Sequence, residues 1–276
     1  MRTLSTPSGV RFGLLGERGA SPAPTLFVFA EKIGETLGEY FNKCGRILAR
    51  NGFLSVALHL PCHGEGRRAG EPSELNGWRA RLERGEDFLS GFLARASAVL
   101  DHLIREGYTD PLRVAAGGTS RGGFAALHFA AAEPRVRCVA AFAPVTDLLA
   151  LREFAGMERH AATNALAVHL WRARPPLAAR PGYCRHGSAA YGCLALLNLT
   201  EKLTGRPVWI CIGNNDERVN TGSAIRFARG LVAAAVTRQV PAPVELHVMP
   251  TVGHTIHATA HDEATAWILQ HIAEGR

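Results

Sequence analysis

Short apolar runs alternate with longer segments of helix-favouring composition along most of this chain. The runs have the length of buried strands, and the segments between them have the length of helices. The predicted strands are residues 25–30, 53–60, 112–116, 136–143, 207–213 and 243–249, and the predicted helices are residues 35–51, 86–106, 124–132, 221–236 and 258–273. Such alternation predicts an α/β fold in which helices cover both faces of a mostly parallel sheet.

Three regions depart from this pattern. Residues 2–5 and 10–15 flank a turn-forming Thr-Pro-Ser-Gly sequence and predict a hairpin. Residues 61–85 and 147–206 are too long for plain connections between elements. The second of these segments has helical composition over 147–172 and 188–203. Since long loops on such scaffolds tend to carry function, we expect residues 147–206 to form a lid or cap, rather than a surface embellishment, within a single domain of residues 1–276.

The third predicted strand runs into residues 118–123, with the sequence Gly-Thr-Ser-Arg-Gly-Gly, and a predicted helix follows. A strand, a Gly-x-Ser-x-Gly turn and a helix together form a nucleophile elbow. The tight turn would hold Ser120 in a strained backbone conformation that its glycine neighbours permit, with its hydroxyl clear of the sheet. The N–H of Arg121 would lie at the start of the helix, where developing negative charge is stabilised. The sequence therefore predicts a nucleophilic serine at position 120.

A nucleophilic serine needs a base and a group that orients the base. The fifth predicted strand leads into Asp216, and the sixth leads into His254. Serine, acid and histidine, each after a later strand, follow one another in the order found in α/β-hydrolases. Glu217 is a rival for the acid. Asp147, after the fourth predicted strand, is the fallback, with helix N-capping as its alternative role.

Four segments resemble those of the α/β-hydrolase superfamily, nearest to its dienelactone hydrolase-like and prolyl oligopeptidase-like esterase branches. They are Gly118-Thr119-Ser120-Arg121-Gly122-Gly123, Gly213-Asn214-Asn215-Asp216-Glu217-Arg218-Val219, Gly253-His254 and Leu60-Pro61-Cys62-His63-Gly64-Glu65-Gly66. The family spacing in the second segment favours Asp216 over its neighbour as the acid. The last segment is similar to the family's Pro-x-His-Gly-x-Gly turn, and we interpret it as a structural turn because it follows the wrong strand for an oxyanion loop. The resemblance covers about residues 10–275 and implies hydrolytic chemistry.

The resemblance also implies a second oxyanion donor in the loop after the first predicted strand. The sequence there is Ala30-Glu31-Lys32-Ile33-Gly34, which departs from the family's frequent His-Gly and is similar to the dienelactone hydrolase form. In that alignment the backbone N–H of Lys32 donates, or that of Glu31 if the register slips by one residue. The Glu31 carboxylate either touches the resting nucleophile or is a solvated loop carboxylate, since burying it unpaired would be costly.

Several histidines near the C-terminus support a competing hypothesis of metal-dependent hydrolysis. His254, His257 and His261 would share one face of a helix, and Asp262 and His271 stand nearby as further ligands. The preceding Pro-Thr-Val-Gly favours a loop at His254 instead, and no His-Glu-x-x-His sequence occurs in the chain. We therefore expect no metal site, and we expect His257 and His261 to lie on a helix surface or to support neighbouring groups.

Composition and charge narrow the possible partners. The chain has 276 residues, of which 47% are hydrophobic and 20% charged, an ordinary globular balance, and a net charge of +7. Lys32, Lys43 and Lys202 are the only lysines among its 31 basic residues. No basic run or basic–aromatic pattern predicts nucleic-acid binding. No apolar run predicts a signal peptide or a membrane span, so we expect neither nucleic acid nor membrane as a partner.

The six cysteines include no Cys-x-x-Cys pair. Cys138 and Cys211 fall in predicted buried strands, where a free thiol behaves as a small hydrophobic group. Cys184 and Cys193 could pair within one loop. We expect a reducing, cytoplasmic location.

Together these inferences predict a serine hydrolase that cleaves carboxylic esters of small or medium acyl groups through an acyl-enzyme. Ser120, His254 and Asp216 would form its triad, and neither a metal nor an organic cofactor is needed. The expected partner is a small-molecule ester, and the sequence leaves the oligomeric state open. The enzymatic alternative is a prolyl oligopeptidase-like serine peptidase, although such enzymes carry a propeller domain for which we expect no room. The alternative outside enzymology is a non-catalytic hydrolase-fold binding protein, against which the three retained triad residues argue.

Overall fold

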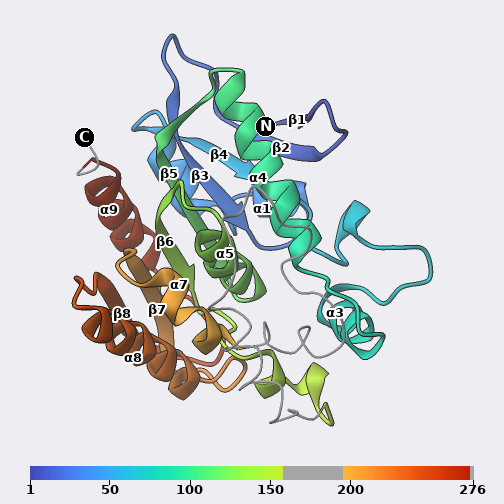
Figure 1. The fold of residues 1–276 in the computed structure, drawn as a ribbon, viewed down its shortest axis with the longest axis vertical. Coiled ribbons are helices and arrows are strands. Elements are labelled where there is room, and N and C mark those ends of the chain that lie inside the picture. The colour runs from blue at the N-terminus through green and yellow to red at the C-terminus, as the bar shows by residue number, and fades with distance from the viewer. Residues whose placement is uncertain (158–194, 274–276) are drawn as a thin grey trace.

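An eight-stranded sheet forms the centre of the computed structural model, which describes residues 1–157 and 195–273 (Figure 1). The strands are β1 (Arg2–Ser5), β2 (Arg11–Leu15), β3 (Ala23–Phe29), β4 (Leu54–Ala57), β5 (Thr109–Thr119), β6 (Val136–Phe142), β7 (Val208–Asn215) and β8 (Val244–Val252). Their order across the sheet is β1-β2-β4-β3-β5-β6-β7-β8. The pairs β1–β2 and β2–β4 are antiparallel, and the later pairs are parallel. The predicted N-terminal hairpin and mostly parallel sheet are therefore confirmed.

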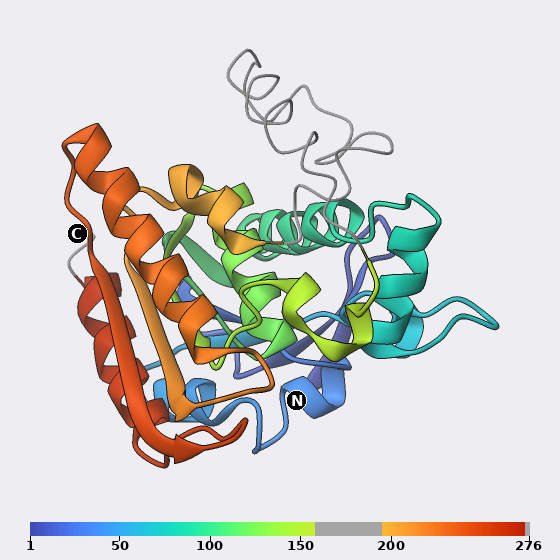
Figure 2. The same cartoon turned by 90° about the horizontal axis from the view of Figure 1, so that it is seen from below.

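Helices cover both faces of this sheet (Figures 1 and 2). They are α1 (Ile33–Thr36), α2 (Lys43–Ala49), α3 (Glu74–Glu83), α4 (Ser90–Arg105), α5 (Arg121–Ala132), α7 (Thr200–Leu203), α8 (Thr221–Arg238) and α9 (Ala260–Ala273). The helices α2 and α9 pack side by side on one face, whereas α4, α5 and α8 cover the other. Successive strand residues point to opposite faces, so Ala115 belongs to the core under α9 and Ala116 to the core under α5.

The predicted helix over residues 35–51 is wrong in its middle. The first helix, α1, ends at Thr36, and α2 begins only at Lys43. The chain turns between them at Gly38, where the backbone N–H bonds to the Glu35 carbonyl and where a glycine weakens any continuing helix. Leu37, which is 1% exposed, packs over Gly13 of β2 and fixes this turn.

Residues 61–85 are organised around a buried ion pair. The Glu71 carboxylate binds Arg81 of α3 through both oxygens, at 2.6 and 2.7 Å. These hydrogen bonds lower the pKa of Glu71 to about 2. Trp78 is fully buried, and its indole Nε1 donates to the carbonyl of Pro61 at 2.7 Å. A short 3-10 turn, η1 (Gly64–Gly66), precedes α3, so the predicted turn in this segment is confirmed.

The long segment 147–206 is described only at its two ends. The helical composition of residues 147–172 gives two 3-10 turns in the described part, η2 (Leu148–Ala150) and η3 (Arg152–Phe154), rather than an α-helix. Asp147 caps η2 by accepting the N–H of Leu149, which is the alternative role foreseen for it. The far end contains the 3-10 turn η6 (Leu196–Leu199), followed by α7. Residues 158–194 lie outside the described part, so the lid remains a prediction.

The thiols in the described part are unpaired. Cys44, Cys62, Cys138 and Cys211 are free and buried. Cys184 and Cys193 lie outside the described residues. Among the helices of residues 1–157 and 195–273, none combines the length and the apolar character that crossing a membrane requires.

Candidate active site

Ser120 lies between the end of β5 and the start of α5 with a φ of 56° and a ψ of −119°. A non-glycine residue rarely adopts a positive φ, and here three backbone hydrogen bonds enforce it. The N–H of Ser120 donates to the carbonyl of Phe142, and its own carbonyl accepts from the N–H groups of Phe124 and Val145. The strained turn that the sequence predicts is therefore present, and neighbouring elements hold it.

Two glycines let the chain close this turn. A Cβ on Gly122 would lie 1.8 Å from the carbonyl oxygen of Phe29, at the end of β3. A Cβ on Gly118 would lie 2.4 Å from the backbone of Gly122. The start of α5 thus approaches the end of β3 more closely than any side chain would allow. This approach brings the loop after β3 next to the first turn of α5.

Asp216 and His254 meet at the end of the sheet formed by β7 and β8. His254 Nδ1 lies 2.7 Å from Asp216 Oδ2. The second carboxylate oxygen accepts the backbone N–H groups of Arg218 and Val219 at 3.0 and 3.1 Å. The Asp216 side chain is fully buried, whereas that of His254 is 28% exposed. Because the carboxylate only accepts, Nδ1 is the nitrogen that carries the proton in the neutral imidazole, and Nε2 is then the one that can take up a proton.

The structure brings two of the three predicted triad residues into contact and places the third at the same edge of the sheet. Ser120, Asp216 and His254 follow the C-terminal ends of β5, β7 and β8, which are parallel. Among the hydrogen bonds of the described residues, none joins the hydroxyl of Ser120 to His254. Such bonds are often long in unliganded hydrolases and tighten with substrate. The rival acid Glu217 is exposed.

The loop after β3 distinguishes the two candidates for the second oxyanion donor. The N–H of Glu31 already donates to Thr36 Oγ1 at 2.9 Å. The N–H of Ile33 donates to His59 Nδ1 at 3.3 Å. No hydrogen bond within the described part uses the N–H of Lys32. Of the two candidates, Lys32 is therefore the one whose N–H makes no hydrogen bond in the described part of the chain.

The Glu31 side chain has neither of the two roles considered for it, contact with the nucleophile or full solvation. It binds the guanidinium of Arg121, with Nη2 2.5 Å from Oε1. Arg121 Nη1 binds Glu74 of α3 at 2.9 Å. Partial burial and a hydrogen bond to the Glu35 carboxyl raise the pKa of Glu31, and the charge of Arg121 opposes this rise. The interpretation as a solvated carboxylate is therefore wrong, and the carboxylate is taken up by Arg121 rather than by Ser120.

The helical face that would have carried a metal does not form. His254 lies in the loop before α9, and α9 begins only at Ala260. His261 is 7% exposed, its ring stacks on Phe142 with centroids 4.5 Å apart, and burial lowers its pKa to about 4. The helix-surface interpretation is therefore wrong for this residue. Within residues 1–157 and 195–273, no three His, Cys, Asp or Glu side chains gather to hold a metal ion.

Sequence reasoning missed the ion pairs that connect the site to α3 and to η3. Arg218, two residues after the predicted acid, binds both carboxylate oxygens of Glu153 at 2.5 and 2.7 Å. Arg79 of α3 donates to the backbone carbonyls of Glu153 and Ala155. In a chain with this many arginines, no local signal identifies which of them pair with these carboxylates. An arginine one residue after Ser120 and another two residues after Asp216 are only a weak signal.

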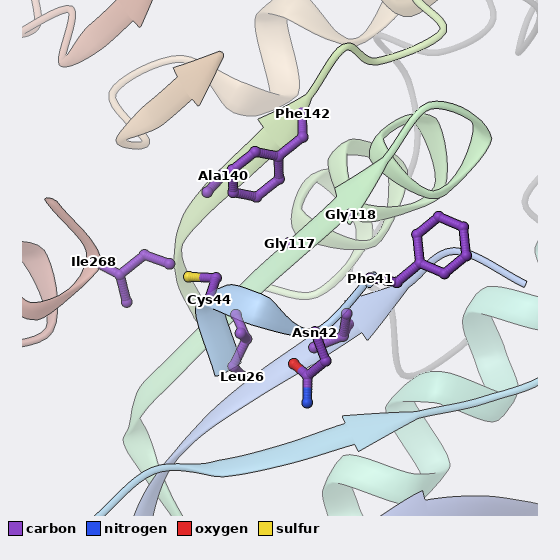
Figure 3. Close-up of a pocket in the computed structure, with 10 residues that line it drawn as sticks. Leu26, Phe41, Asn42, Cys44, Gly117, Gly118, Ala140, Phe142 and Ile268 are labelled. Carbon is purple, nitrogen blue, oxygen red and sulfur yellow. The ribbon is translucent and has the colours of Figure 1, made fainter. Parts of the chain in front are cut away.

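A small pocket lies on the other side of β5 from α5 (Figure 3). It is lined by side chains of β3, β6, α2 and α9, by Phe41 and Asn42 just before α2, and by the backbone of Gly117 and Gly118. Ser120, Asp216 and His254 are not among its lining residues. The pocket is therefore separate from the candidate site, although it lies beneath the same strand.

A model of the prolyl oligopeptidase family matches residues 96–275. No curated protein matches the chain in sequence. Among solved structures, TT1662 from Thermus thermophilus is 21% identical with a TM-score of 0.63, over 100% of this chain and 99% of that one. Acetyl xylan esterase 1 from Thermoanaerobacterium sp. JW/SL YS485 is 19% identical with a TM-score of 0.61, over 98% and 82%. Dipeptidyl peptidase 4 from Porphyromonas gingivalis is 15% identical with a TM-score of 0.61, over 98% and 35%. At these identities the three structures show a shared fold.

Proposed function

The chain belongs to the prolyl oligopeptidase family of the α/β-hydrolase superfamily, and from this premise we propose that it cleaves carboxylic esters of small or medium acyl groups. The family and the shared fold support the broader class, a serine hydrolase, and the predicted α/β-hydrolase fold is confirmed. The ester substrate and the catalytic roles given below are our proposal.

One observation carries this proposal. A buried carboxylate, with each oxygen accepting a hydrogen bond, orients a partly exposed imidazole at the edge of the sheet where Ser120 lies on a strained turn. A structural role needs neither the strain nor an imidazole with a free lone pair. Strain of this kind amounts to about 1–3 kcal/mol per residue and is usually found where it serves function.

In the proposed mechanism His254 Nε2 takes the hydroxyl proton of Ser120 as the oxygen attacks the ester carbonyl. Asp216 holds the imidazole tautomer and stabilises the imidazolium that forms. The tetrahedral intermediate collapses when the bond to the alcohol oxygen breaks and His254 returns the proton to that oxygen. Water then attacks the acyl-enzyme with His254 again as base, which releases the acid and restores Ser120.

The negative oxygen of the intermediate would be received by the N–H groups of Arg121 and Lys32. Arg121 is the first residue of α5, where backbone N–H groups have no helical acceptor. Lys32 is favoured over Glu31 because the N–H of Glu31 already binds Thr36. Loss of one such donor typically raises the barrier by about 3 kcal/mol.

A serine peptidase is the alternative, favoured by the family and by the likeness to a dipeptidyl peptidase. The ester proposal is supported by an acetyl xylan esterase whose fold matches most of both chains. A panel of chromogenic esters of graded acyl length, assayed beside a peptide amide, distinguishes the two. We expect turnover of acetyl to butyryl esters, and faster cleavage of the amide would favour the peptidase.

The class itself is tested with a fluorophosphonate probe, which reacts with an activated serine. We expect the wild-type protein and a Ser21→Ala control, altered at an exposed serine, to be labelled. The Ser120→Ala variant should be folded, unlabelled and nearly inactive. A fully active Ser120→Ala protein would end the proposal, and an unlabelled wild type would point to a binding protein.

The proposed chemistry uses protein groups alone, without a metal or an organic cofactor. We propose a reducing, cytoplasmic setting, supported by the four free thiols of the described part.

A further inference from the structure

His63, in the turn before α3, is a buried side chain to which the proposed mechanism gives no role. It is 3% exposed. Its Nδ1 lies 2.8 Å from the carbonyl oxygen of Pro61. A carbonyl only accepts, so Nδ1 carries the proton and Nε2 presents a lone pair. Nε2 is buried and has no partner among the described residues.

The imidazole of His63 stays neutral near pH 7, because burial lowers its pKa to about 4. Its Nε2 is therefore a permanent hydrogen-bond acceptor in that range. The charged groups whose fields reach His63 are Arg121, Glu74 and Glu35. Arg121 and Glu74 belong, with Glu31, to the cluster of ion pairs that joins α5, α3 and the loop after β3, whereas Glu35 lies in α1.

Arg121 supplies the complementary atom. Its Nη2 binds Glu31 and its Nη1 binds Glu74, which leaves Nε–H. Nε is buried and, like His63 Nε2, has no partner among the described residues. A donor and an acceptor, both buried and both unpaired, thus occur in one cluster. Each unpaired group is unfavourable, and one hydrogen bond between them would satisfy both.

The backbone around His63 is strained in a way that fixes this arrangement. Cys62 has a φ of 62° and Glu74 a φ of 58°. The N–H of Glu74 donates to the carbonyl of Cys62 at 3.0 Å, which ties the turn to the start of α3. This hydrogen bond therefore holds Cys62, which precedes His63, next to Glu74, which binds Arg121. Such strain persists only where the surrounding structure determines it strongly.

We propose that His63 is a positioning residue of the hydrolytic site and acts through Arg121. Its Nε2 accepts a hydrogen bond from Arg121 Nε, directly or through one water molecule, and fixes the guanidinium between Glu31 and Glu74. Arg121 follows the nucleophile and Glu31 precedes Lys32, so this link sets the separation of the two proposed oxyanion donors. The inference rests on the proposed function of the site.

Two substitutions separate this role from a structural one. His63→Asn keeps a donor at the Nδ1 position for Pro61 but has no atom at the Nε2 position. His63→Gln places an amide oxygen near the Nε2 position but loses the donor to Pro61. We expect kcat for an activated ester to fall about 10- to 100-fold in His63→Asn, with KM unchanged, because misplaced donors act on the transition state.

His63→Gln should keep kcat within about threefold of the wild type, since the acceptor is retained. If the bond to Pro61 were what matters, the order would reverse, with His63→Asn the more active variant. That reversed order, or equal losses in the two variants, would overturn the inference.

A double-mutant cycle tests whether the effect passes through Arg121. Arg121→Lys keeps the positive charge and the backbone N–H but has no Nε donor. In that background His63→Asn should lower kcat no further, because the link is already absent. Losses that multiply independently would contradict the inference.

A readout without turnover keeps the inference separate from the proposed function. In Ser120→Ala protein labelled with 15N-histidine, the His63 Nε2 resonance should report an unprotonated, hydrogen-bonded nitrogen that shifts on Arg121→Lys. An unchanged resonance would refute the link even if the protein is an esterase. If the fluorophosphonate probe labels no serine, the proposed function is wrong, but the His63 Nε2 resonance still shows whether the link to Arg121 exists. The same resonance tests the link if neither His63 variant folds.

Discussion

Asp216 and His254, after β7 and β8, form the acid side of the proposed site, and the loop after β3 with the start of α5 forms its oxyanion side. The acid side is paired more completely than the oxyanion side. Both oxygens of the buried Asp216 carboxylate accept hydrogen bonds. On the oxyanion side, Arg121 Nε and His63 Nε2 are buried without partners among the described residues. The N–H of Lys32 is open as well.

This difference teaches where the site is already organised and where a ligand or water must complete it. Donors and acceptors fixed before the reaction need no reorganisation as charge develops. The acid side meets this condition without a ligand. On the oxyanion side, each unpaired buried group costs about 1–3 kcal/mol, which a hydrogen bond from a ligand or water would recover. Substrate binding should therefore change the oxyanion side more than the acid side.

Helix α3 connects the two sides. Glu74, at its first residue, binds Arg121 on the oxyanion side. Arg79, one turn later, donates to the backbone of η3, whose Glu153 binds Arg218 on the acid side. A shift of this helix would therefore act on both sides together.

The largest expected effect is on the acid side. Asp216→Asn should lower kcat about 10⁴-fold, because an amide donor facing Nδ1 favours the wrong imidazole tautomer. The steady-state rate with an activated ester measures it. Glu217→Gln, a change in the exposed neighbour, should leave the rate within about twofold. Equal losses in the two variants would show that Asp216 is not the orienting acid.

The next effect is on the close approach that brings the oxyanion loop to α5. Gly122→Ala places a Cβ 1.8 Å from the carbonyl of Phe29, so the backbone must move. We expect the free energy of unfolding to fall by about 3 kcal/mol, together with kcat. Gly91→Ala in α4, where a Cβ meets nothing within 4 Å, is the matched control and should be neutral or slightly stabilising. Urea unfolding distinguishes them, and an unaffected Gly122→Ala protein would contradict the tight packing.

Acid should weaken the protein through its buried imidazoles. His63 and His261 both have pKa values lowered to about 4, so below pH 6.5 the unfolded chain binds protons that the folded one does not. Stability is therefore complete above pH 6.5 and is lost as the pH falls toward 4, by up to about 1.4 kcal/mol per pH unit for each group.

Replacing one of these imidazoles measures how much it contributes to the loss of stability in acid. His261→Phe keeps the stacking on Phe142 and should flatten the dependence of unfolding free energy on pH between 6.5 and 4. His257→Asn, altered at a partly exposed histidine, should leave the slope as it is. An unchanged slope in His261→Phe would mean that this imidazole titrates normally.

The smallest effect concerns the Glu31–Arg121 ion pair. Glu31→Gln removes a charge that is 26% exposed, and we expect kcat to fall about threefold to tenfold with an activated ester. Glu35→Gln removes a carboxylate that is 47% exposed and bound to Lys32, and should change kcat less than twofold. A loss on Glu31→Gln as large as that on Asp216→Asn would erase the contrast between the two sides.

The parts of the candidate site that the sequence predicts are those encoded by neighbouring residues. The elbow needs only a strand, two glycines and a helix in sequence, and Asp216 and His254 come a few residues after apolar runs. The cluster around Arg121 joins residues 31, 74 and 121, which no local pattern connects. The burial of His63 likewise depends on how the turn before α3 packs against the rest of the molecule, and this is fixed only in three dimensions.

The errors in the fold have the same origin. Residues 35–51 contain helix formers, but the packing of Leu37 over Gly13 of β2, a tertiary contact, stops the helix early. Helical composition after Asp147 gives 3-10 turns because arginines of α3 and of the acid loop bind the backbone and side chain of Glu153. In both places a long-range contact overrides propensity.

The position of β8 has a consequence for how the molecule responds to heat. Every residue of β8 is partly or fully exposed, and among the described strands it pairs with β7 alone. The strand β5, which leads into Ser120, has a neighbour on each side and a run of buried residues. Edge strands of a sheet open more readily than central strands, so amide hydrogens of β8 should exchange sooner than those of β5. On warming, the proposed base His254 would move away from the proposed nucleophile Ser120 while the central strands stay folded, and cooling would restore the site.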